Sequence, residues 1–331
     1  MDTPLLSINI VSYQTKDITL QCLRSIEKSL ALRWLTKTPS HDIEIVIVDN
    51  NSKDGSFDAI EQYKSSLGIP IRLIRNTENA GFGKGHNKAA RASRGEYLLL
   101  LNTDTIMVKD ALATFVSECM ANNPPHTKAY EALVTRPTRT GYKVHFAGPQ
   151  LLNEDFSPQP SCGPYYSIPT IIGALFLRGD YWGLTRYAPS IPKAVDWVSG
   201  ACIMCRKDDF LELDGFDENI FMYMEEIELL YRARKKGMNV WYLPNAQLVH
   251  LGSASSNKTY PIFQVYRGFL FLYRTHHHPW ALGMVQWLLA LKARLVIALA
   301  MLLGRQKLME TYRSALAIVQ ESRQKLPSSP I

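Results

Sequence analysis

Residues 98–105, LLLLNTDT, decide the fold: four leucines are followed directly by Asn102, Thr103 and Asp104. An uninterrupted apolar run predicts a strand buried on both faces, which is typical of a parallel sheet covered by helices. Such sheets bind ligands beyond the carboxyl ends of their strands. Asp104 could therefore hold a divalent cation against a phosphate oxygen. It could also be only a turn former or a helix cap.

Strands and helices alternate on the way to this run. The apolar patterns predict strands at 5–13, 43–48 and 70–74, and helices at 17–32, 57–67 and near 87–93. This alternation predicts an α/β fold with a mostly parallel sheet and right-handed crossovers.

The pattern changes after the fourth predicted strand, the leucine run. Residues 122–170 contain many prolines, so we expect short strands and long loops there. Regular structure is predicted again as a strand and helix in 197–213, a helix at 225–237 ended by Gly237, and a strand at 239–243.

Composition describes a globular protein with a basic surface. The chain has 331 residues, a net charge of +7 and five cysteines. The charge suits a nucleotide phosphate or an anionic membrane, although it could simply be a solvated surface. The odd cysteine count gives no disulfide framework, and we interpret Cys202 and Cys205 as buried thiols. With no signal peptide evident, we expect a cytoplasmic protein.

The C-terminal segment 281–303 is apolar and long enough to span a bilayer. Lys292 and Arg294 fall near its centre, where charge is unfavourable. A helix lying at the membrane surface, with Trp280 and Trp287 as interfacial anchors, fits better. The alternative is a helix packed on the protein's own core or on a second subunit.

Polar residues also follow the second predicted strand, at 49–52 (DNNS). The carboxylate of Asp49 could accept a hydrogen bond from the imide nitrogen of a uracil or thymine ring. The other interpretation is a plain turn, because Asp, Asn and Ser all favour turns.

A glycine-rich segment at 79–87 (NAGFGKGHN) is predicted to be a loop. Gly81, Gly83 and Gly85 would let the backbone approach a ligand, and Lys84 could meet a phosphate. The spacing matches neither the dinucleotide fingerprint nor the Walker loop.

Carboxylates gather in 214–232 (DGFDENIFMYMEEIELLYR), where Glu225, Glu226 and Glu228 crowd the start of a predicted helix. They could simply complement the helix dipole, or one could act as a general base facing a cleft. His250 ends a further apolar stretch and is either a polar core residue or a metal ligand.

The order of the motifs is more specific than any one of them. The series VDNNSKDGS, NAGFGKGHN, LLLLNTDT, SGACIMCRKDDF, GFDENIFMYMEEIELLYR and LPNAQLVHLG resembles the family 2 glycosyltransferases, and most closely their rhamnosyltransferase-like branch in bacterial surface polysaccharide synthesis. The resemblance covers residues 7 to about 255, and YRGFLFLYRTHHHPW at 266–280 is also similar to that branch.

The resemblance implies a GT-A fold, a nucleotide-diphosphate sugar donor and inversion at the anomeric carbon. It divides the chain into a nucleotide-sugar half (1–121), an acceptor-binding and catalytic half (122–255) and a helical C-terminal extension (256–331).

The resemblance also assigns residues to the nucleotide-sugar site. These are Val11, Ser12, Tyr13, Asp49, Asn51, Asn79, Gly81, Phe82, Asn87, Asn102, Thr103, Asp104 and Arg232. Arg232 could face a diphosphate or pair with Glu228 one helical turn away.

Asp104 and His250 match the family's metal ligands, for Mg²⁺ or Mn²⁺. The first aspartate of the family's D-x-D motif is Asn102 here. Glu225 and Glu226 match the Glu-Asp pair that supplies the base, with Glu226 replacing the aspartate. We favour Glu226 as the base.

For partners, we expect a dTDP-linked deoxyhexose such as rhamnose as donor, or a UDP-sugar as the alternative. The expected acceptor is a glycan or a polyprenyl-diphosphate-linked sugar at the inner face of the cell membrane. We expect no nucleic acid, and the C-terminal helices could form a homo-oligomer. Rival interpretations are a non-catalytic sugar-nucleotide-binding member and a nucleotidyltransferase.

Overall fold

The structure is a computed structural model that describes residues 4–34, 42–65, 68–120, 143–252 and 260–324. Its N-terminal part follows the predicted alternation. The elements are β1 (Leu6–Ser12), α1 (Lys16–Trp34), β2 (Ile43–Asp49), α2 (Ser56–Lys64), β3 (Ile71–Arg75), α3 (Phe82–Ala92) and β4 (Tyr97–Asn102). The four strands are parallel in the order β3-β2-β1-β4, which confirms the predicted α/β fold.

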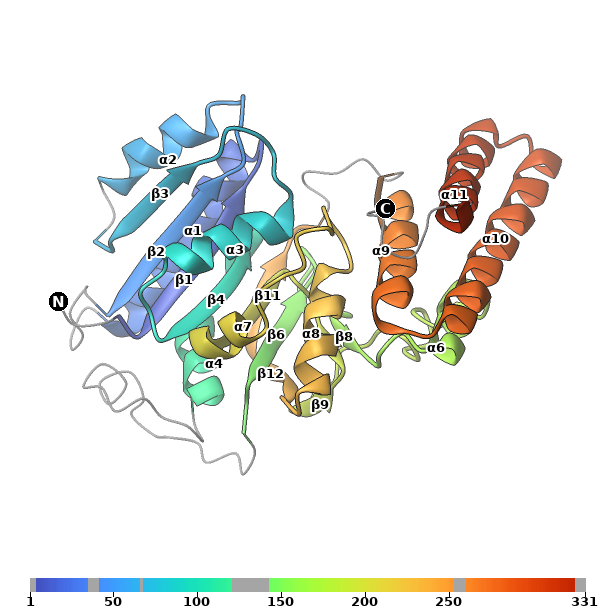
Figure 1. The fold of residues 1–331 in the computed structure, drawn as a ribbon. Coiled ribbons are helices and arrows are strands. Elements are labelled where there is room, and N and C mark those ends of the chain that lie inside the picture. The colour runs from blue at the N-terminus through green and yellow to red at the C-terminus, as the bar shows by residue number, and fades with distance from the viewer. Residues whose placement is uncertain (1–3, 35–41, 66–67, 121–142, 253–259, 325–331) are drawn as a thin grey trace.

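Shorter elements follow. They are β5 (Thr105–Met107), α4 (Ala111–Met120), β6 (Phe146–Leu152), β7 (Pro158–Gln159), β8 (Cys162–Gly163), α6 (Ile168–Phe176), β9 (Lys193–Val195), β10 (Trp197–Val198), β11 (Cys202–Arg206), α7 (Lys207–Glu212), α8 (Glu225–Lys235) and β12 (Val240–His250). The large sheet continues from β4 through β11, β6 and β12 to β5. Strands from both 1–121 and 122–255 therefore share one large sheet, while β8 and β10 form a separate two-stranded sheet (Figure 1).

The leucine run at 98–101 lies in β4, at the middle of this sheet, and all four side chains are buried. Leu99 and Leu101 join one core with α1 and α4, whereas Leu98 and Leu100 join a second core with α7 and α8. Successive side chains of a strand point to opposite faces, so β4 contributes to both cores. The prediction of a strand buried on both faces is confirmed.

The glycine-rich segment is mostly helix, which corrects the prediction of a loop. Helix α3 begins at Phe82, after Gly81 in a left-handed conformation with φ +87°. A Cβ on Gly85 would lie 2.8 Å from the methyl groups of Val11, and one on Gly83 would lie 3.0 Å from Cβ of Phe216. Both glycines therefore allow α3 to pack closely.

Two further boundaries differ from the sequence prediction. Strand β12 runs to His250, and its register against β6 shifts between Leu243 and Gln247. Asn245 and Gln247 are exposed within this irregular stretch, which interrupts the apolar pattern by which strands are recognised. Strand β5 has only three residues, too few to show a pattern.

Helices α9 (Tyr260–His276), α10 (Pro279–Leu302) and α11 (Gln306–Gln324) pack against one another beside the sheet domain (Figure 1). Helix α10 confirms the predicted helix at 281–303. Within the described residues it alone is long and apolar enough to cross a membrane, by length and composition. All five cysteines are buried and unbridged, as expected for structural thiols.

Candidate functional site

Asp104 and His250 lie side by side at the far edge of the sheet. The chain leaves β4 at Asn102, turns through Thr103 and Asp104, and re-enters the sheet as β5, which pairs antiparallel with the end of β12. Nε2 of His250 lies 3.4 Å from Oδ1 of Asp104, and the backbone N–H of Leu251 donates to the carbonyl of Asp104 at 2.9 Å. The short strand β5 thus brings together two residues that are distant in the sequence.

The imidazole of His250 is oriented by Gln159 of β7. Nε2 of Gln159 donates to Oδ1 of Asn153 at 3.1 Å, so its Oε1 is left as an acceptor. Nδ1 of His250 lies 2.7 Å from that oxygen and must carry the proton. In the neutral ring, Nε2 then carries the lone pair and faces Asp104, which is the arrangement of a metal-ligating histidine.

This donor set fits a divalent ion only in part. One carboxylate and one neutral imidazole suit Mg²⁺ or Mn²⁺ when substrate phosphates complete the coordination. Among the described residues, no group of three or more His, Cys, Asp or Glu side chains could hold a metal alone. The site therefore fits an ion that arrives with, or is completed by, a phosphorylated ligand.

Asp49, at the end of β2, has one carboxylate oxygen in use and one without a partner. Oδ1 accepts the N–H of Ser52 at 3.0 Å, whereas Oδ2 is buried with no hydrogen bond. An unpaired buried carboxylate oxygen is unfavourable unless a ligand supplies a donor. This geometry fits recognition of an N–H group.

Asn50 holds the neighbouring loop in place, although no specific role for it was predicted. Its Nδ2 donates to the carbonyl of Gly81 at 3.0 Å and to Oδ1 of Asn79 at 3.3 Å. Its Oδ1 accepts from Asn76 at 2.7 Å. Asn79 and Gly81 are therefore fixed beside the end of β2, next to Asp49.

Two other predicted nucleotide contacts are bonded within the protein. Asn51, with φ +63°, donates to the carbonyl of Thr77 at 2.7 Å and accepts from Lys53 at 2.7 Å. Asn87 is buried, donates to the carbonyl of Phe216 at 2.8 Å and accepts its N–H at 2.9 Å. Both amides stabilise the chain around the site.

Glu225 and Glu226 begin helix α8, after Met224 with φ +75°. Burial raises the pKa of Glu225 well above its usual range, and the neighbouring charge of Glu226 raises it further. Oε2 of Glu225 has no hydrogen-bond partner. Burial also raises the pKa of Glu226. Backbone N–H groups, including that of Gly200, favour the charged form and oppose this rise. Glu226 is thus the better placed of the two to be ionised.

A short connection links Glu226 to the end of β4. A Cβ on Gly200 would lie 3.7 Å from both Cδ of Glu226 and the ring of Phe82. The next residue, Ala201, accepts the backbone N–H of Asn102 at 3.0 Å. The loop that contains Gly200 and Ala201 therefore lies next to Glu226, Phe82 and the end of β4 that precedes Asp104.

Arg232 is fully engaged within the protein. Its guanidinium donates to both carboxylate oxygens of Glu228 at 2.7 Å and to the backbone carbonyls of Leu213 and Gly215. His276 also contacts Glu228, at 2.7 Å. Of the two interpretations from the sequence, the structure supports the salt bridge, and Arg232 is not available to a diphosphate in this conformation.

The remaining predicted residues lie at or next to the carboxyl ends of β1 and β4. Ser12 ends β1, is buried and contacts Thr19 at 3.3 Å, while Val11 and Tyr13 beside it are partly exposed. Asn102 has a buried Oδ1 without a partner, and Thr103 is buried.

No sequence motif pointed to Gln159 or Arg186. Gln159 lies in a two-residue strand, and Arg186 follows a loop, so neither belongs to a motif. Arg186 lies over the Trp197 ring, 5.5 Å from its centroid, and its Nε is buried without a partner.

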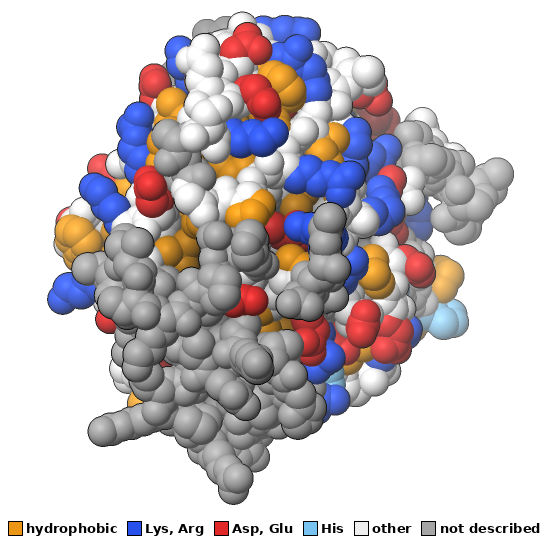
Figure 2. All heavy atoms as spheres, turned by 90° about the vertical axis from the view of Figure 1, so that its left-hand side faces the viewer, with side chains coloured by type: hydrophobic (Ala, Val, Ile, Leu, Met, Phe, Trp, Pro, Cys, Tyr) orange, Lys and Arg blue, Asp and Glu red, His pale blue; other side chains and the backbone are white. Residues whose placement is uncertain are grey.

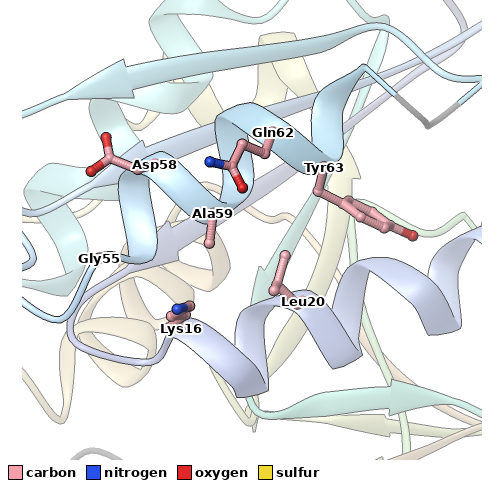
Figure 3. Close-up of a pocket in the computed structure, with 7 residues that line it drawn as sticks. All are labelled: Lys16, Leu20, Gly55, Asp58, Ala59, Gln62 and Tyr63. Atoms are coloured by element: carbon pink, nitrogen blue, oxygen red, sulfur yellow. The ribbon is translucent and has the colours of Figure 1, made fainter.

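A separate hollow of about 510 Å³ lies between α1 and α2 (Figure 3). It is lined by Lys16, Leu20, Gly55, Asp58, Ala59, Gln62 and Tyr63. None of the predicted site residues lines this hollow, so we assign the candidate site to the strand ends.

Comparison with known proteins agrees with this geometry. Residues 7–141 match the family model described as Glycosyl transferase family 2. The chain is 28% identical over 250 residues to the N-acetylglucosaminyl-diphospho-decaprenol L-rhamnosyltransferase of Mycobacterium tuberculosis H37Rv, covering 70% of this chain and 74% of the relative. It is 26% identical over 178 residues to the rhamnosyltransferase WbbL of Escherichia coli K12, covering 51% and 60% of the two chains.

Solved structures show the same fold. The mannosyltransferase PcManGT from Pyrobaculum calidifontis, in complex with GDP-Man and Mn²⁺, aligns with a TM-score of 0.53 over 96% of this chain and 87% of its own, at 15% identity. GalNAc-T7 with UDP, GalNAc and Mn²⁺ aligns with a TM-score of 0.52 over 82% and 48%, at 14% identity. The sheet order, the family match and the relatives lead to one conclusion: the chain is a glycosyltransferase with a GT-A fold, and its residues 7–141 match glycosyl transferase family 2.

Proposed function

We propose that this glycosyltransferase is metal-dependent and inverting, and that it moves rhamnose or another deoxyhexose from a dTDP-sugar onto a lipid-linked or glycan acceptor in cell-surface polysaccharide synthesis. The observation that carries the proposal is the contact between Asp104 and His250 beside the nucleotide-side strand ends. Relatives described as rhamnosyltransferases support the donor.

Asp49 and the segment from Asn79 to Phe82 are proposed to hold the nucleoside. The free Oδ2 of Asp49 would accept the imide N–H of thymine or uracil, a donor that cytosine lacks at the same position. Asn50 keeps the Asn79–Gly81 backbone against that position. This arrangement supports a dTDP- or UDP-linked donor, and UDP-sugars remain the alternative.

Asp104 and His250 are proposed to hold Mg²⁺ or Mn²⁺ together with the diphosphate. The ion, when bound, would neutralise the charge that develops on the departing nucleoside diphosphate. Gln159 keeps the imidazole in the tautomer with a free Nε2. The Mn²⁺ named with GDP-Man in the PcManGT structure is in keeping with this role.

Glu226 is proposed to deprotonate the acceptor hydroxyl. Direct attack by that hydroxyl, opposite the leaving group, inverts the anomeric carbon and needs one base on the acceptor side. A pKa raised by burial brings a glutamate nearer to neutral pH, where a general base is most effective. Burial and the charge of Glu226 both disfavour the anionic form of Glu225. Glu225 would therefore stay protonated and support the start of the helix.

The acceptor is proposed to be bound by residues 122–255 and to be a sugar on a polyprenyl diphosphate, as the name of the Mycobacterium relative describes for that enzyme. The enzyme would then work in the cytoplasm, at the inner face of the membrane.

A transfer assay tests this function. The purified chain is incubated with Mn²⁺, an N-acetylglucosaminyl-diphospho-prenol with a short chain, and dTDP-rhamnose, UDP-glucose or UDP-galactose in turn. The proposal predicts a rhamnosylated product with inverted configuration from dTDP-rhamnose. Turnover of a UDP-sugar alone would support the alternative donor, and no product or nucleotide binding with any donor would favour a non-catalytic role.

A further inference from the structure

Helix α10 presents an exposed apolar face. Seven large side chains along it are at least 42% exposed: Trp280, Met284, Trp287, Leu295, Leu299, Met301 and Leu302. Most of these side chains are three, four, seven or eight residues apart, so they share one side of the helix. The opposite side, with Val285, Leu289 and Ala293, is buried.

A second element extends this face. The segment Leu177–Leu184, directly after α6, exposes Leu177, Tyr181, Trp182 and Leu184 by 61–70%. Nζ of Lys292, in the middle of α10, donates to the carbonyl of Leu175 at 2.7 Å and lies 5.9 Å from the centroid of the Phe176 ring. The end of α6 is therefore attached to α10, next to the exposed stripe (Figure 1).

The composition of this apolar face differs from that of the rest of the surface. It has three aromatic side chains with polar ring atoms, Trp280, Trp287 and Trp182, a type enriched where proteins meet the bilayer interface. On the face that carries α2 and β3, by contrast, basic, acidic and apolar side chains are interspersed (Figure 2).

Helices α10 and α11 carry a positive net charge. Residues 279–324 contain six lysines and arginines but only two glutamates, within a chain of net charge +7. Arg294 is exposed between Trp287 and Leu295, and its long side chain can reach headgroups while its stem stays on apolar surface. An anionic lipid surface is therefore complementary in charge and in hydrophobicity.

A helix spanning the bilayer does not fit the same contacts. Val285, Leu289 and Ala293 are buried where α10 packs on α9 and α11, and Lys292 is tied to Leu175. Spanning would break these contacts and leave Lys292 and Arg294 near the bilayer centre.

We propose that the exposed side of α10 and the segment Leu177–Leu184 together bind the surface of an anionic lipid bilayer. The inference rests on the proposed function in one respect: the bilayer would carry the lipid-linked acceptor. The segment Leu177–Leu184 continues through Thr185 to Arg186. Arg186 lies over the ring of Trp197 in β10, and β10 packs against α8, the helix that begins with Glu225 and Glu226.

Vesicle flotation with the full chain tests the proposal without requiring activity. The probes are vesicles of phosphatidylcholine alone and vesicles with one third phosphatidylglycerol. The wild-type chain is expected to float with the anionic vesicles and at least tenfold less with the neutral ones. The variant Trp182→Ser/Trp287→Ser should lose at least tenfold in binding. The matched control is Leu211→Ser, which changes an exposed leucine of α7 and should float like the wild type.

Three results would overturn the proposal. The first is a wild-type chain that stays unbound with both vesicle types. The second is a double variant that floats normally. The third is a wild-type dimer in gel filtration that the double variant converts to a monomer, with no vesicle binding, because the apolar face would then bind a second copy. Transfer to a water-soluble short-chain acceptor is measured in parallel. If transfer is retained while flotation fails, the proposed function stands and the membrane-binding surface does not. If flotation succeeds while no donor is turned over, the membrane-binding surface stands and the proposed function does not.

Discussion

Nε2 of His250 lies 3.4 Å from Oδ1 of Asp104, at the one place where the end of β12 pairs with the three-residue strand β5. Both side chains are largely buried; His250 ends β12, and Asp104 lies in the two-residue turn between β4 and β5. A pair placed this way is held without any ligand, so the loss of either member should affect ligand binding more than folding.

Glu226→Gln is predicted to lower kcat by about 10²–10⁴-fold, because the variant removes the proposed general base. Glu225→Gln should keep most of the activity, because burial and the charge of Glu226 raise the pKa of Glu225 and keep it protonated near neutral pH. Steady-state kinetics of the two isosteric variants separate these roles. A larger loss in Glu225→Gln would reverse the assignment.

The pH profile gives a second test of the same base. A general base works only when deprotonated, and burial raises the pKa of Glu226 above that of a free glutamate. The acid limb of kcat/KM should therefore fall as pH decreases through a value above about 4.3, the ordinary pKa of glutamate. This limb should be absent from the residual activity of Glu226→Gln.

Gln159→Leu is predicted to weaken Mn²⁺ binding by about 10–100-fold, because the variant removes the acceptor that fixes the His250 tautomer. Gln159→Glu keeps an acceptor oxygen and should retain most of the affinity. Isothermal titration with Mn²⁺ in the presence of dTDP checks both. Equal affinity of the leucine variant and the wild type would show that Gln159 does not orient the imidazole.

Arg232→Met is predicted to destabilise the fold by about 3–5 kcal/mol without raising the KM for the donor. The reason is that Glu228, whose side chain is 1% exposed, would lose its guanidinium partner and keep only the contact with His276. The double variant Arg232→Met/Glu228→Leu should recover part of this loss. Chemical denaturation and donor kinetics check the prediction, and a selective rise in donor KM would instead support a diphosphate contact.

His86 is predicted to make the protein less stable in mild acid. Burial alone lowers its pKa from 6.5 to about 3, and neither ring nitrogen has a hydrogen-bond partner. Below pH 6.5 the unfolded chain binds a proton that the folded one excludes, so stability falls by about 1.4 kcal/mol per pH unit. His86→Leu should flatten this slope in denaturation curves at pH 7 and pH 5, whereas His278→Gln, at an exposed histidine, should not.

The sequence was sufficient for the elements that repeat a pattern. The leucines of β4 predicted a strand buried on both faces, and the order of motifs predicted the family. The glycine segment was wrongly predicted to be a loop because glycines are typical of loops, whereas here they allow a helix to pack closely, as Gly85 does against Val11. Only the three-dimensional contacts show this packing.

Contacts between short elements that are far apart in the chain could not be predicted from the sequence. Strand β5 is too short to recognise, yet it places Asp104 beside His250. Gln159 acquires its role from a two-residue strand paired with β6. Arg232 could be assigned to Glu228 only when both partners were seen, because helical spacing alone left a diphosphate equally possible.

The most direct test of the central claim is electron paramagnetic resonance of Mn²⁺ titrated into the protein with dTDP. The signal of free Mn²⁺ should disappear as the wild-type ternary complex forms. Asp104→Ala and His250→Ala should each weaken this binding by at least tenfold, while the exposed variant Leu211→Ser should match the wild type. If both site variants bound Mn²⁺ and dTDP like the wild type, Asp104 and His250 would not be the metal site, and the proposed mechanism would be wrong.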